Sequence, residues 1–138
     1  MLLSPKQALA LLARVDLTRT FKGCPVGLRD AAVLALIARG YSAVEIAALQ
    51  GTHITMARGR VIITVKRQGF PLSARLPVDL GNRVLAWLHA SHLWSTSAPA
   101  FTGVLGPLSA RGVCKIVERY CDKQSTPRVR RTRRRRNR

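Results

Sequence analysis

Gly40-Tyr41-Ser42-Ala43-Val44-Glu45-Ile46-Ala47-Ala48-Leu49 and Val61-Ile62-Ile63-Thr64-Val65-Lys66 are the two stretches whose contrast predicts the fold class. In the first stretch Ser42 stands three residues before Glu45, which is the spacing of a capping box at the start of a helix. In the second stretch Val61, Ile63 and Val65 alternate with Ile62, Thr64 and Lys66, which is typical of a strand. The chain therefore changes from a helical period to a strand period near Ile54, and an α+β fold is expected.

Further helices are expected on both sides of the strands. Ser4 followed by proline predicts the start of a first helix, because serine caps well and proline is tolerated at the first helical position. A second helix is expected to open near Asp30 and to end at Gly40, a fourth to cover residues 79–93, and a last one to open with Ser109 as its cap. The predicted inward faces are Leu9, Leu12 and Val15 in the first helix, Val33, Leu34, Ile37 and Ala38 in the second, Leu80, Val84, Leu85 and Leu88 in the fourth, and Val113, Ile116, Val117 and Tyr120 in the last.

Two shorter strands are expected beside the central one. The first is predicted over residues 52–55, with a turn at 57–59 that joins it to the central strand. Gly, Phe and Pro at residues 69–71 are predicted to break the pattern, which resumes as a third strand over 74–78. A loop rich in Ser, Pro and Gly is expected over 95–106. The predicted architecture is a set of helices around a small three-stranded antiparallel sheet.

The charge of the chain indicates a polyanionic partner. The 138 residues include 24 Lys and Arg against 6 Asp and Glu, a formal net charge of +18, and 47% of the residues are hydrophobic. Such a field attracts nucleic acid, whereas a ribosomal protein or a membrane-surface protein is the alternative reading. We expect one folded domain over residues 1–127 and a disordered arginine-rich tail over 128–138, because the tail has almost nothing apolar to bury.

The cysteines and the N-terminus indicate a reducing compartment. Cys24, Cys114 and Cys121 are an odd number, and no secretion signal is recognised at the start of the chain. Cys114 and Cys121 are expected two turns apart on one helix, too far for a disulfide. No apolar run approaches the length of a membrane span. A cytoplasmic, nucleoid-associated protein without membrane contact is therefore expected.

Four blocks of the chain resemble the catalytic domain of the tyrosine recombinases, the phage integrase family. The first block runs from Arg29-Asp30, which precede an apolar helix, to Gly40, Glu45 and Ile46, which fall in the register of the family's Gly-Leu-Arg-x-Ser-Glu-Leu motif. Later blocks are Lys66 in the hairpin, Arg75-Leu76-Pro77-Val78 in a strand, and the helix opening Gly106-Pro107-Leu108-Ser109-Ala110-Arg111-Gly112-Val113. The resemblance covers about residues 4 to 132 and implies the helical fold with a three-stranded sheet.

The resemblance also implies which parts of the family's chemistry are present. Lys66 aligns with the lysine that protonates the leaving 5′ oxygen, and Arg130 aligns with the second phosphate-holding arginine in vestigial form. Ser42 stands where the family has its first catalytic arginine, and the nucleophilic tyrosine has no counterpart, since Tyr41 and Tyr120 are expected on packing faces. Loss of the nucleophile removes the covalent route, so a DNA-binding protein that does not cleave is expected.

The predicted partner is duplex DNA, with no cofactor and no metal. The residues expected to contact it are Lys66, Arg67, Arg75, Arg111, Lys115, Arg128, Arg130, Arg131, Arg133, Arg134, Arg135, Arg136 and Arg138. The resemblance is compatible with a module that occupies recombination or operator sites, with a truncated integrase remnant, and with a nucleic-acid binder that kept only the fold. A full-length recombinase or a second copy of the chain is a further expected partner.

A helix-turn-helix regulator is the alternative function. Residues 33–47 also resemble the first two helices of that motif, with a Gly-x-Ser turn followed by Glu-Ile-Ala. A recognition helix would then have to follow Leu49, where the sequence instead turns to a strand pattern. His89 and His92 share a helix face, but they lack a third ligand at regular spacing and are expected at the surface.

Overall fold

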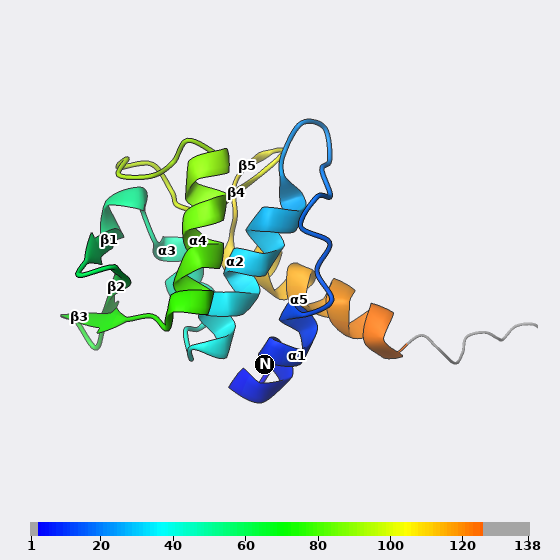
Figure 1. The fold of residues 1–138 in the computed structure, drawn as a ribbon, viewed down its shortest axis with the longest axis horizontal. Coiled ribbons are helices and arrows are strands. Elements are labelled where there is room, and N and C mark those ends of the chain that lie inside the picture. The colour runs from blue at the N-terminus through cyan, green and yellow to red at the C-terminus, as the bar shows by residue number, and fades with distance from the viewer. Residues whose placement is uncertain (1–2, 126–138) are drawn as a thin grey trace, which may run out of the picture.

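The computed structural model describes residues 3–125, which form an α+β fold of helices around a three-stranded antiparallel sheet (Figure 1). The α+β prediction is therefore confirmed. The helices are α1 (Pro5–Leu12), α2 (Val26–Ala38), α3 (Ala43–Ala48), α4 (Val78–Ala90) and α5 (Ala110–Ser125), with a 3-10 turn η1 (Gly51–His53). The strands are β1 (Ile54–Ala57), β2 (Arg60–Arg67) and β3 (Phe70–Arg75), and a separate pair consists of β4 (Thr102–Gly103) and β5 (Gly106–Pro107).

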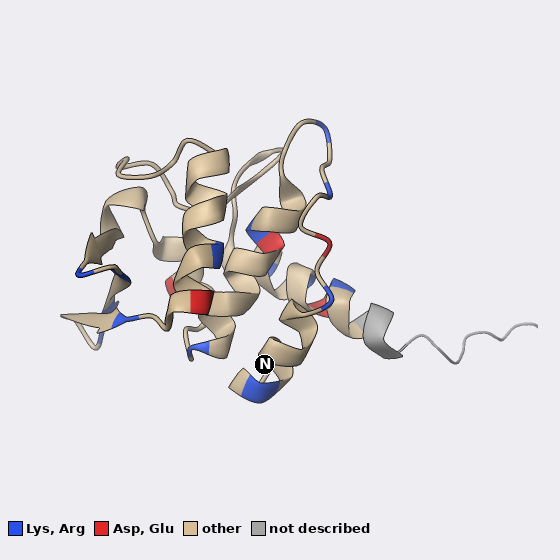
Figure 2. Ribbon diagram, in the orientation of Figure 1, with Lys and Arg blue, Asp and Glu red and all other residues tan. Residues whose placement is uncertain are grey.

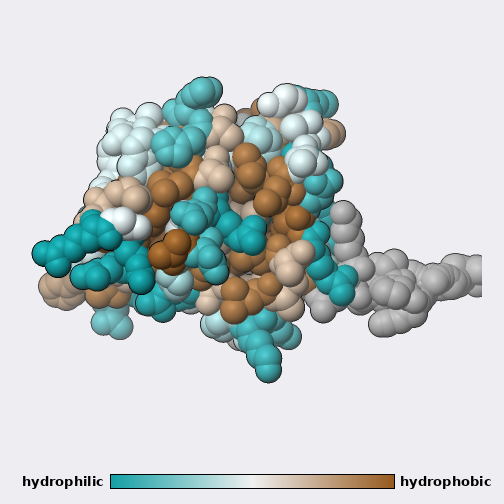
Figure 3. Space-filling view, viewed as in Figure 1, coloured by the Kyte–Doolittle hydropathy of each residue, from teal (hydrophilic) through white to brown (hydrophobic). Residues whose placement is uncertain are grey.

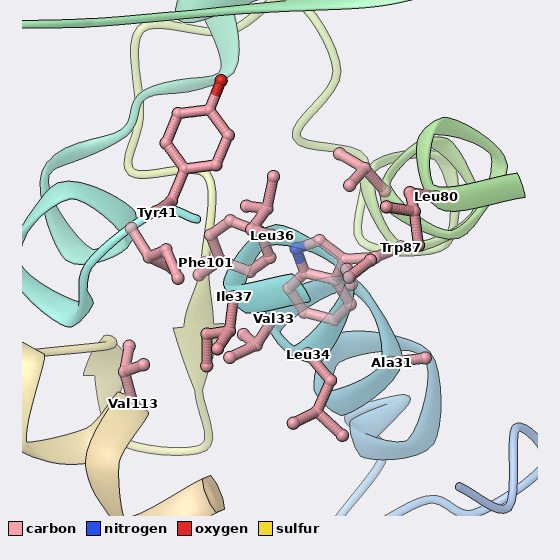
Figure 4. Close-up of a cluster of buried hydrophobic side chains, with 14 of the residues drawn as sticks. Ala31, Val33, Leu34, Leu36, Ile37, Tyr41, Leu80, Trp87, Phe101 and Val113 are labelled. Carbon is pink, nitrogen blue, oxygen red and sulfur yellow. The ribbon is translucent and has the colours of Figure 1, made fainter. Parts of the chain in front are cut away.

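Helix α2 lies at the centre of the helical layer. It packs against α1, α3, α4 and α5, and from residue 29 to residue 37 every one of its residues is buried. Figure 4 shows Val33, Leu36 and Ile37 of α2 between Trp87 of α4 and Val113 of α5. A helix that is apolar on nearly all sides has to be surrounded in this way. Consequently α2 contributes most of the contacts that hold the other helices in place.

Trp87 connects α4 to the loop that follows it. Its ring stacks on Phe101 with the centroids 6.3 Å apart and the planes 4° from parallel. Its indole N–H donates a 2.7 Å hydrogen bond to the carbonyl oxygen of Ala100, so the one polar group of this buried ring is satisfied. The loop expected over residues 95–106 is thereby fixed to the core, and it also contains β4.

The sheet buries one face of β2 and exposes the other. Val61, Ile63 and Val65 are almost inaccessible to solvent, as their alternation predicts, and β2 packs against α4. In the turn from β2 to β3, Gln68 and Gly69 have φ angles of 53° and 84°. Two residues with positive φ form the tight hairpin whose twist suits antiparallel strands. This turn fixes the register that sets Lys66 opposite Pro71.

Two strand boundaries differ from the sequence-based expectation. The first strand begins at Ile54 rather than at residue 52, because residues 51–53 form the turn η1, in which the His53 Nδ1 accepts a hydrogen bond from the Gln50 N–H at 3.0 Å. The third strand starts at Phe70 and ends at Arg75, whereas residues 74–78 were expected. Pro71 is tolerated because β3 is an edge strand, where one missing N–H leaves no partner unsatisfied.

The helix boundaries also needed correction. Leu9 was expected to face inward but is 50% exposed, and α1 instead buries Ala8, Leu11 and Leu12. Spacings of three and four residues from Ala8 define the stripe, which places Leu9 on the solvent side. Helix α2 begins four residues before Asp30, directly after Pro25. The last helix is capped as expected, since the Gly112 N–H donates to the Ser109 Oγ at 3.1 Å.

Asp30 is a fully buried carboxylate on α2 that connects three parts of the chain. Its Oδ1 accepts hydrogen bonds from the Arg29 Nε at 3.0 Å and from the Arg29 Nη2 at 2.9 Å. Its Oδ2 accepts one from the Tyr120 hydroxyl at 2.8 Å and lies 3.5 Å from the Arg119 Nη1 and 3.8 Å from the Arg19 Nη1. The carboxylate therefore joins α2 to α5 and to the loop between α1 and α2.

Replacement of Asp30 by asparagine is expected to reduce the free energy of unfolding by about 3 to 5 kcal/mol. The change leaves buried and partly buried guanidinium groups without their carboxylate, which costs this much in other proteins. Urea-induced unfolding followed by circular dichroism measures the loss.

The matched control is Asp79→Asn, because Asp79 is exposed in the first turn of α4 and contributes less than about 1 kcal/mol there. Equal losses in the two variants would contradict the role given to Asp30.

Candidate nucleic-acid interface

The exposed face of the sheet carries a group of basic side chains. Arg60 and Lys66 lie on the same face of β2, because they are separated by an even number of residues. Arg75 of β3 joins them, since it lies directly opposite Ile62. All three side chains are exposed. We call Arg60, Lys66 and Arg75 the sheet cations.

No acidic residue opposes the sheet cations within the sheet. Residues 54–75 contain Arg58 and Arg67 in addition, and no Asp or Glu. Figure 2 shows Lys and Arg on this part of the ribbon, and Figure 3 shows strongly hydrophilic side chains gathered over it at the left of the view. Between the cations, the Thr64 and Ser73 hydroxyls are 2.7 Å apart in a hydrogen bond. Positive charges and hydroxyl groups of this kind are the usual partners of backbone phosphates.

Arg67 is held by the protein itself. Its Nε donates to the Glu45 Oε2 at 2.6 Å and its Nη2 to the Glu45 Oε1 at 3.1 Å, and the guanidinium lies 5.6 Å from the centre of the Tyr41 ring. The hydrogen bond from Arg67 is the main reason that the pKa of Glu45 is lowered. Arg67 was expected to contact DNA, but in this position it connects β2 to α3, and a carboxylate offsets its charge.

Ser42 is the cap of α3. Its Oγ accepts a hydrogen bond from the Glu45 N–H at 3.1 Å, and the Glu45 carboxylate accepts one from the Ser42 N–H at 2.9 Å. The predicted capping box is therefore confirmed. Ser42 thus has a structural use at the start of α3 and brings no positive charge.

A pocket of about 450 Å³ lies between α3, η1 and the sheet, and Lys66 is at its edge. Thr64, Pro71 and Glu45 also line it, together with His53. The pocket therefore brings together Lys66 and the acidic Glu45, and no arginine among the described residues lines it that could hold a phosphate beside the lysine. This arrangement suits the binding of a phosphate at the edge of the pocket better than the cleavage of a phosphodiester.

The remaining predicted contact residues are not part of this face. Arg111 and Lys115 are exposed and one helical turn apart on α5. The tail arginines at positions 128, 130, 131, 133, 134, 135, 136 and 138, including the vestigial catalytic candidate Arg130, lie outside the described residues. Arg58 and Arg60 were not predicted, although the alternation of β2 would have placed Arg60 on the same face of the strand as Lys66.

Neither described tyrosine is placed to attack a phosphate. Tyr120 is 4% exposed and donates its hydroxyl proton to Asp30. Burial, followed by the charge of Asp30, raises the pKa of Tyr120 to about 12. Burial also raises the pKa of Tyr41, which is 6% exposed. Both phenols are therefore kept protonated and inside the core, as their packing pattern predicts.

No metal site is formed by the residues that the structure describes. His89 and His92 are exposed, and the His89 ring lies 5.9 Å from the Trp94 ring. Cys24, Cys114 and Cys121 are partly exposed. Within the described part of the chain, no helix has the length and apolar character needed to cross a membrane.

No protein-family model matches the chain, and no match is found among curated proteins. The geometry and charge of the described residues therefore carry the functional proposal.

Tyr120→Phe is expected to change how stability depends on alkaline pH. Unfolded tyrosine loses its proton near pH 10, whereas folded Tyr120 keeps its proton until about pH 12. Between these values the native state holds the extra proton, so stability falls as the pH rises, by on the order of 2 kcal/mol from this one group. Unfolding free energies of the protein and the variant, measured from pH 8 to pH 12, give the difference.

The free energy of unfolding of the unsubstituted protein, minus that of the phenylalanine variant, should be constant below pH 10 and should fall above it. A difference that stays constant across the whole pH range would contradict the raised pKa of Tyr120. Tyr41→Phe provides the comparison with a tyrosine that is not bonded to Asp30.

Proposed function

We propose that the chain binds duplex DNA through backbone phosphates, as a protein of tyrosine recombinase type that does not cut its substrate. The observation that carries this proposal is the exposed face of the sheet, where Arg60, Lys66 and Arg75 share one side and the strands themselves contain no Asp or Glu. A surface with one sign of charge attracts a polyanion and lets it release its counterions.

The order of the elements supports the recombinase part of the proposal. An apolar helix, a capped short helix, a hairpin with Lys66 and a helix opening at Ser109 follow one another as the resemblance implies. In that family the hairpin lysine contacts the DNA backbone next to the reacting phosphate. Lys66 is exposed near the end of β2 and free to make such a contact.

Two positions account for the expected lack of cleavage. Ser42 serves as the cap of α3, and Arg67, which is bonded to that helix, is paired with Glu45. Removal of one electrostatic stabiliser commonly lowers a rate about 100- to 1,000-fold. Tyr41 and Tyr120 are both buried, so neither is placed to act as the nucleophile of a covalent route. Occupancy of a site, alone or beside a full-length recombinase, is the role that fits these residues.

The helix-turn-helix reading has less support. After α3 the described chain forms η1 and then β1, so no recognition helix follows in the place where that motif requires one. Helices α2 and α3 remain similar to the first two helices of such a motif only in sequence.

We expect the salt dependence of DNA binding to identify the sheet cations as phosphate contacts. In the triple variant R60Q/K66Q/R75Q, the slope of log affinity against log salt should become less steep by up to about 2.7, at about 0.9 per lost contact. Fluorescence anisotropy with a labelled duplex at several salt concentrations measures the slope.

The control is K6Q/R14Q/R39Q, which removes the same charge from exposed positions on α1, after α1 and at the end of α2. Equal slopes in the two variants would mean that only the overall charge matters. Deletion of residues 128–138 should lower the slope further, and full affinity after this deletion would exclude the tail from binding.

A suicide DNA substrate is expected to trap no covalent adduct with this chain. Tyr41 and Tyr120 are buried and protonated, and Ser42 offers no charge to the phosphate. Denaturing gel electrophoresis after incubation is the measurement.

An adduct that disappears in Tyr41→Phe or Tyr120→Phe would contradict the proposed lack of cleavage. An adduct that appears only after addition of a full-length recombinase, and that contains the added protein, would support the accessory role.

A further inference from the structure

A second basic site lies away from the sheet, around the loop that joins α1 to α2. A pocket of about 620 Å³ is bounded by this loop, by the β4–β5 hairpin and by the start of α5. Figure 1 shows the loop beside β4 and β5 at the upper right, while the sheet lies at the left. Its charged lining residues are all cations: Arg19, Lys22, Arg29 and Arg119.

Asp30 gathers three of these cations around itself. The carboxylate is fully buried beneath them and bonds Arg29 through two nitrogens, while Arg19 and Arg119 lie within 3.8 Å of its other oxygen. One negative charge cannot neutralise three guanidinium groups and the neighbouring Lys22. The pocket therefore has an excess of positive charge on a fixed framework.

Arg19 is held at the edge of the pocket by this carboxylate. Its side chain is 35% exposed, whereas its Nη1 is inaccessible to solvent and lies 3.8 Å from the Asp30 Oδ2, which is too far for a hydrogen bond but within the range of an ion pair. The Nη1 is therefore turned toward Asp30, and the exposed part of the Arg19 side chain is what an anion in the pocket can reach.

The loop that carries Arg19 is fixed in place. The Gly27 N–H donates to the Arg19 carbonyl oxygen at 3.0 Å, and a Cβ at Gly27 would lie 2.1 Å from the Asp16 carbonyl oxygen. Only glycine allows α2 to approach the loop this closely. Phe21 and Cys24 exchange backbone hydrogen bonds of 2.9 Å, which closes the tip of the loop around Lys22. Such preorganisation reduces the entropy that binding costs.

Apolar side chains form the rest of the wall. Phe21 is 53% exposed, Val104 is 43% exposed, and Leu105 is fully exposed, and all three line the pocket. Val26 and Leu108 continue the apolar surface toward the interior. A pocket that combines clustered cations with apolar walls suits an anion that carries an apolar or aromatic group.

We propose that this pocket binds a small phosphate monoester with an aromatic or apolar substituent. The phosphate would lie against Arg19, Arg29 and Arg119, whose planar forks match its oxygens, and the substituent would lie against Phe21 and Leu105. The dianion offsets more of the excess charge than a carboxylate does. The chain's own tail, with eight arginines in residues 128–138, is a poor occupant because its charge has the same sign as the pocket.

Isothermal titration calorimetry with phenyl phosphate tests the proposal on the full chain. We expect saturable binding at one site, several-fold tighter than inorganic phosphate because of the apolar walls. Arg19→Gln and Lys22→Gln should each weaken binding about 10-fold or more, since each removes a charge-assisted contact. Arg14→Gln is the matched control, because Arg14 is exposed and does not line the pocket, and it should bind as the unsubstituted protein does.

Lys22→Gln keeps the proposal testable if Arg19→Gln disturbs folding, because Lys22 is exposed and makes no bond to Asp30. Absence of binding at millimolar phenyl phosphate, or an equal loss in Arg14→Gln, would overturn the proposal. Equal affinity for inorganic phosphate would also overturn it. If duplex DNA competes with phenyl phosphate for this pocket, the phosphates that it binds are those of DNA. That result would overturn the small-molecule assignment but would not contradict the proposed binding of DNA.

Discussion

The burial of Asp30 is the constraint on which much of this molecule depends. A carboxylate removed from water is stable only if it is paired and hydrogen-bonded, and Asp30 obtains its partners from Arg29, Arg119, Arg19 and Tyr120. These residues come from α2, from the loop directly before it, and from α5, which lies much further along the sequence. The same interaction that holds the helical layer together therefore also positions the cations of the second pocket and keeps Tyr120 protonated.

The exposed face of the sheet has a different physical basis. The sheet is attached to the helices through the buried side of β2 and through the bond from Arg67 to Glu45, and its other face is free to carry charge. Because no core packing requires the sheet cations, their side chains are available to a partner. The chain thus separates its basic residues into those that stabilise the fold and those that face solvent, although both kinds look alike in the sequence.

Several features were predictable from the sequence because they depend on near neighbours. The capping box of Ser42 and Glu45, the alternation of β2 and the buried face of α5 involve residues within a few positions of one another, and all three are present in the structure. The misplaced elements depended on context. Pro71 was expected to interrupt a strand, but the edge position of β3 removes the need for its hydrogen bond. Leu9 matched an apolar stripe, but the packing of α1 chose Ala8, Leu11 and Leu12.

The sequence by itself determined the helix-to-strand change, the large positive charge and the presence of Lys66 in a hairpin, since local periodicity and composition suffice for these. Only the tertiary structure decided which cations are free. Arg67 and Lys66 are adjacent in the chain, yet one bonds Glu45 while the other faces solvent, because successive residues of a strand point to opposite sides. Arg19 and Arg119 are one hundred positions apart and meet at one carboxylate, a juxtaposition that arises when α2 and α5 pack together.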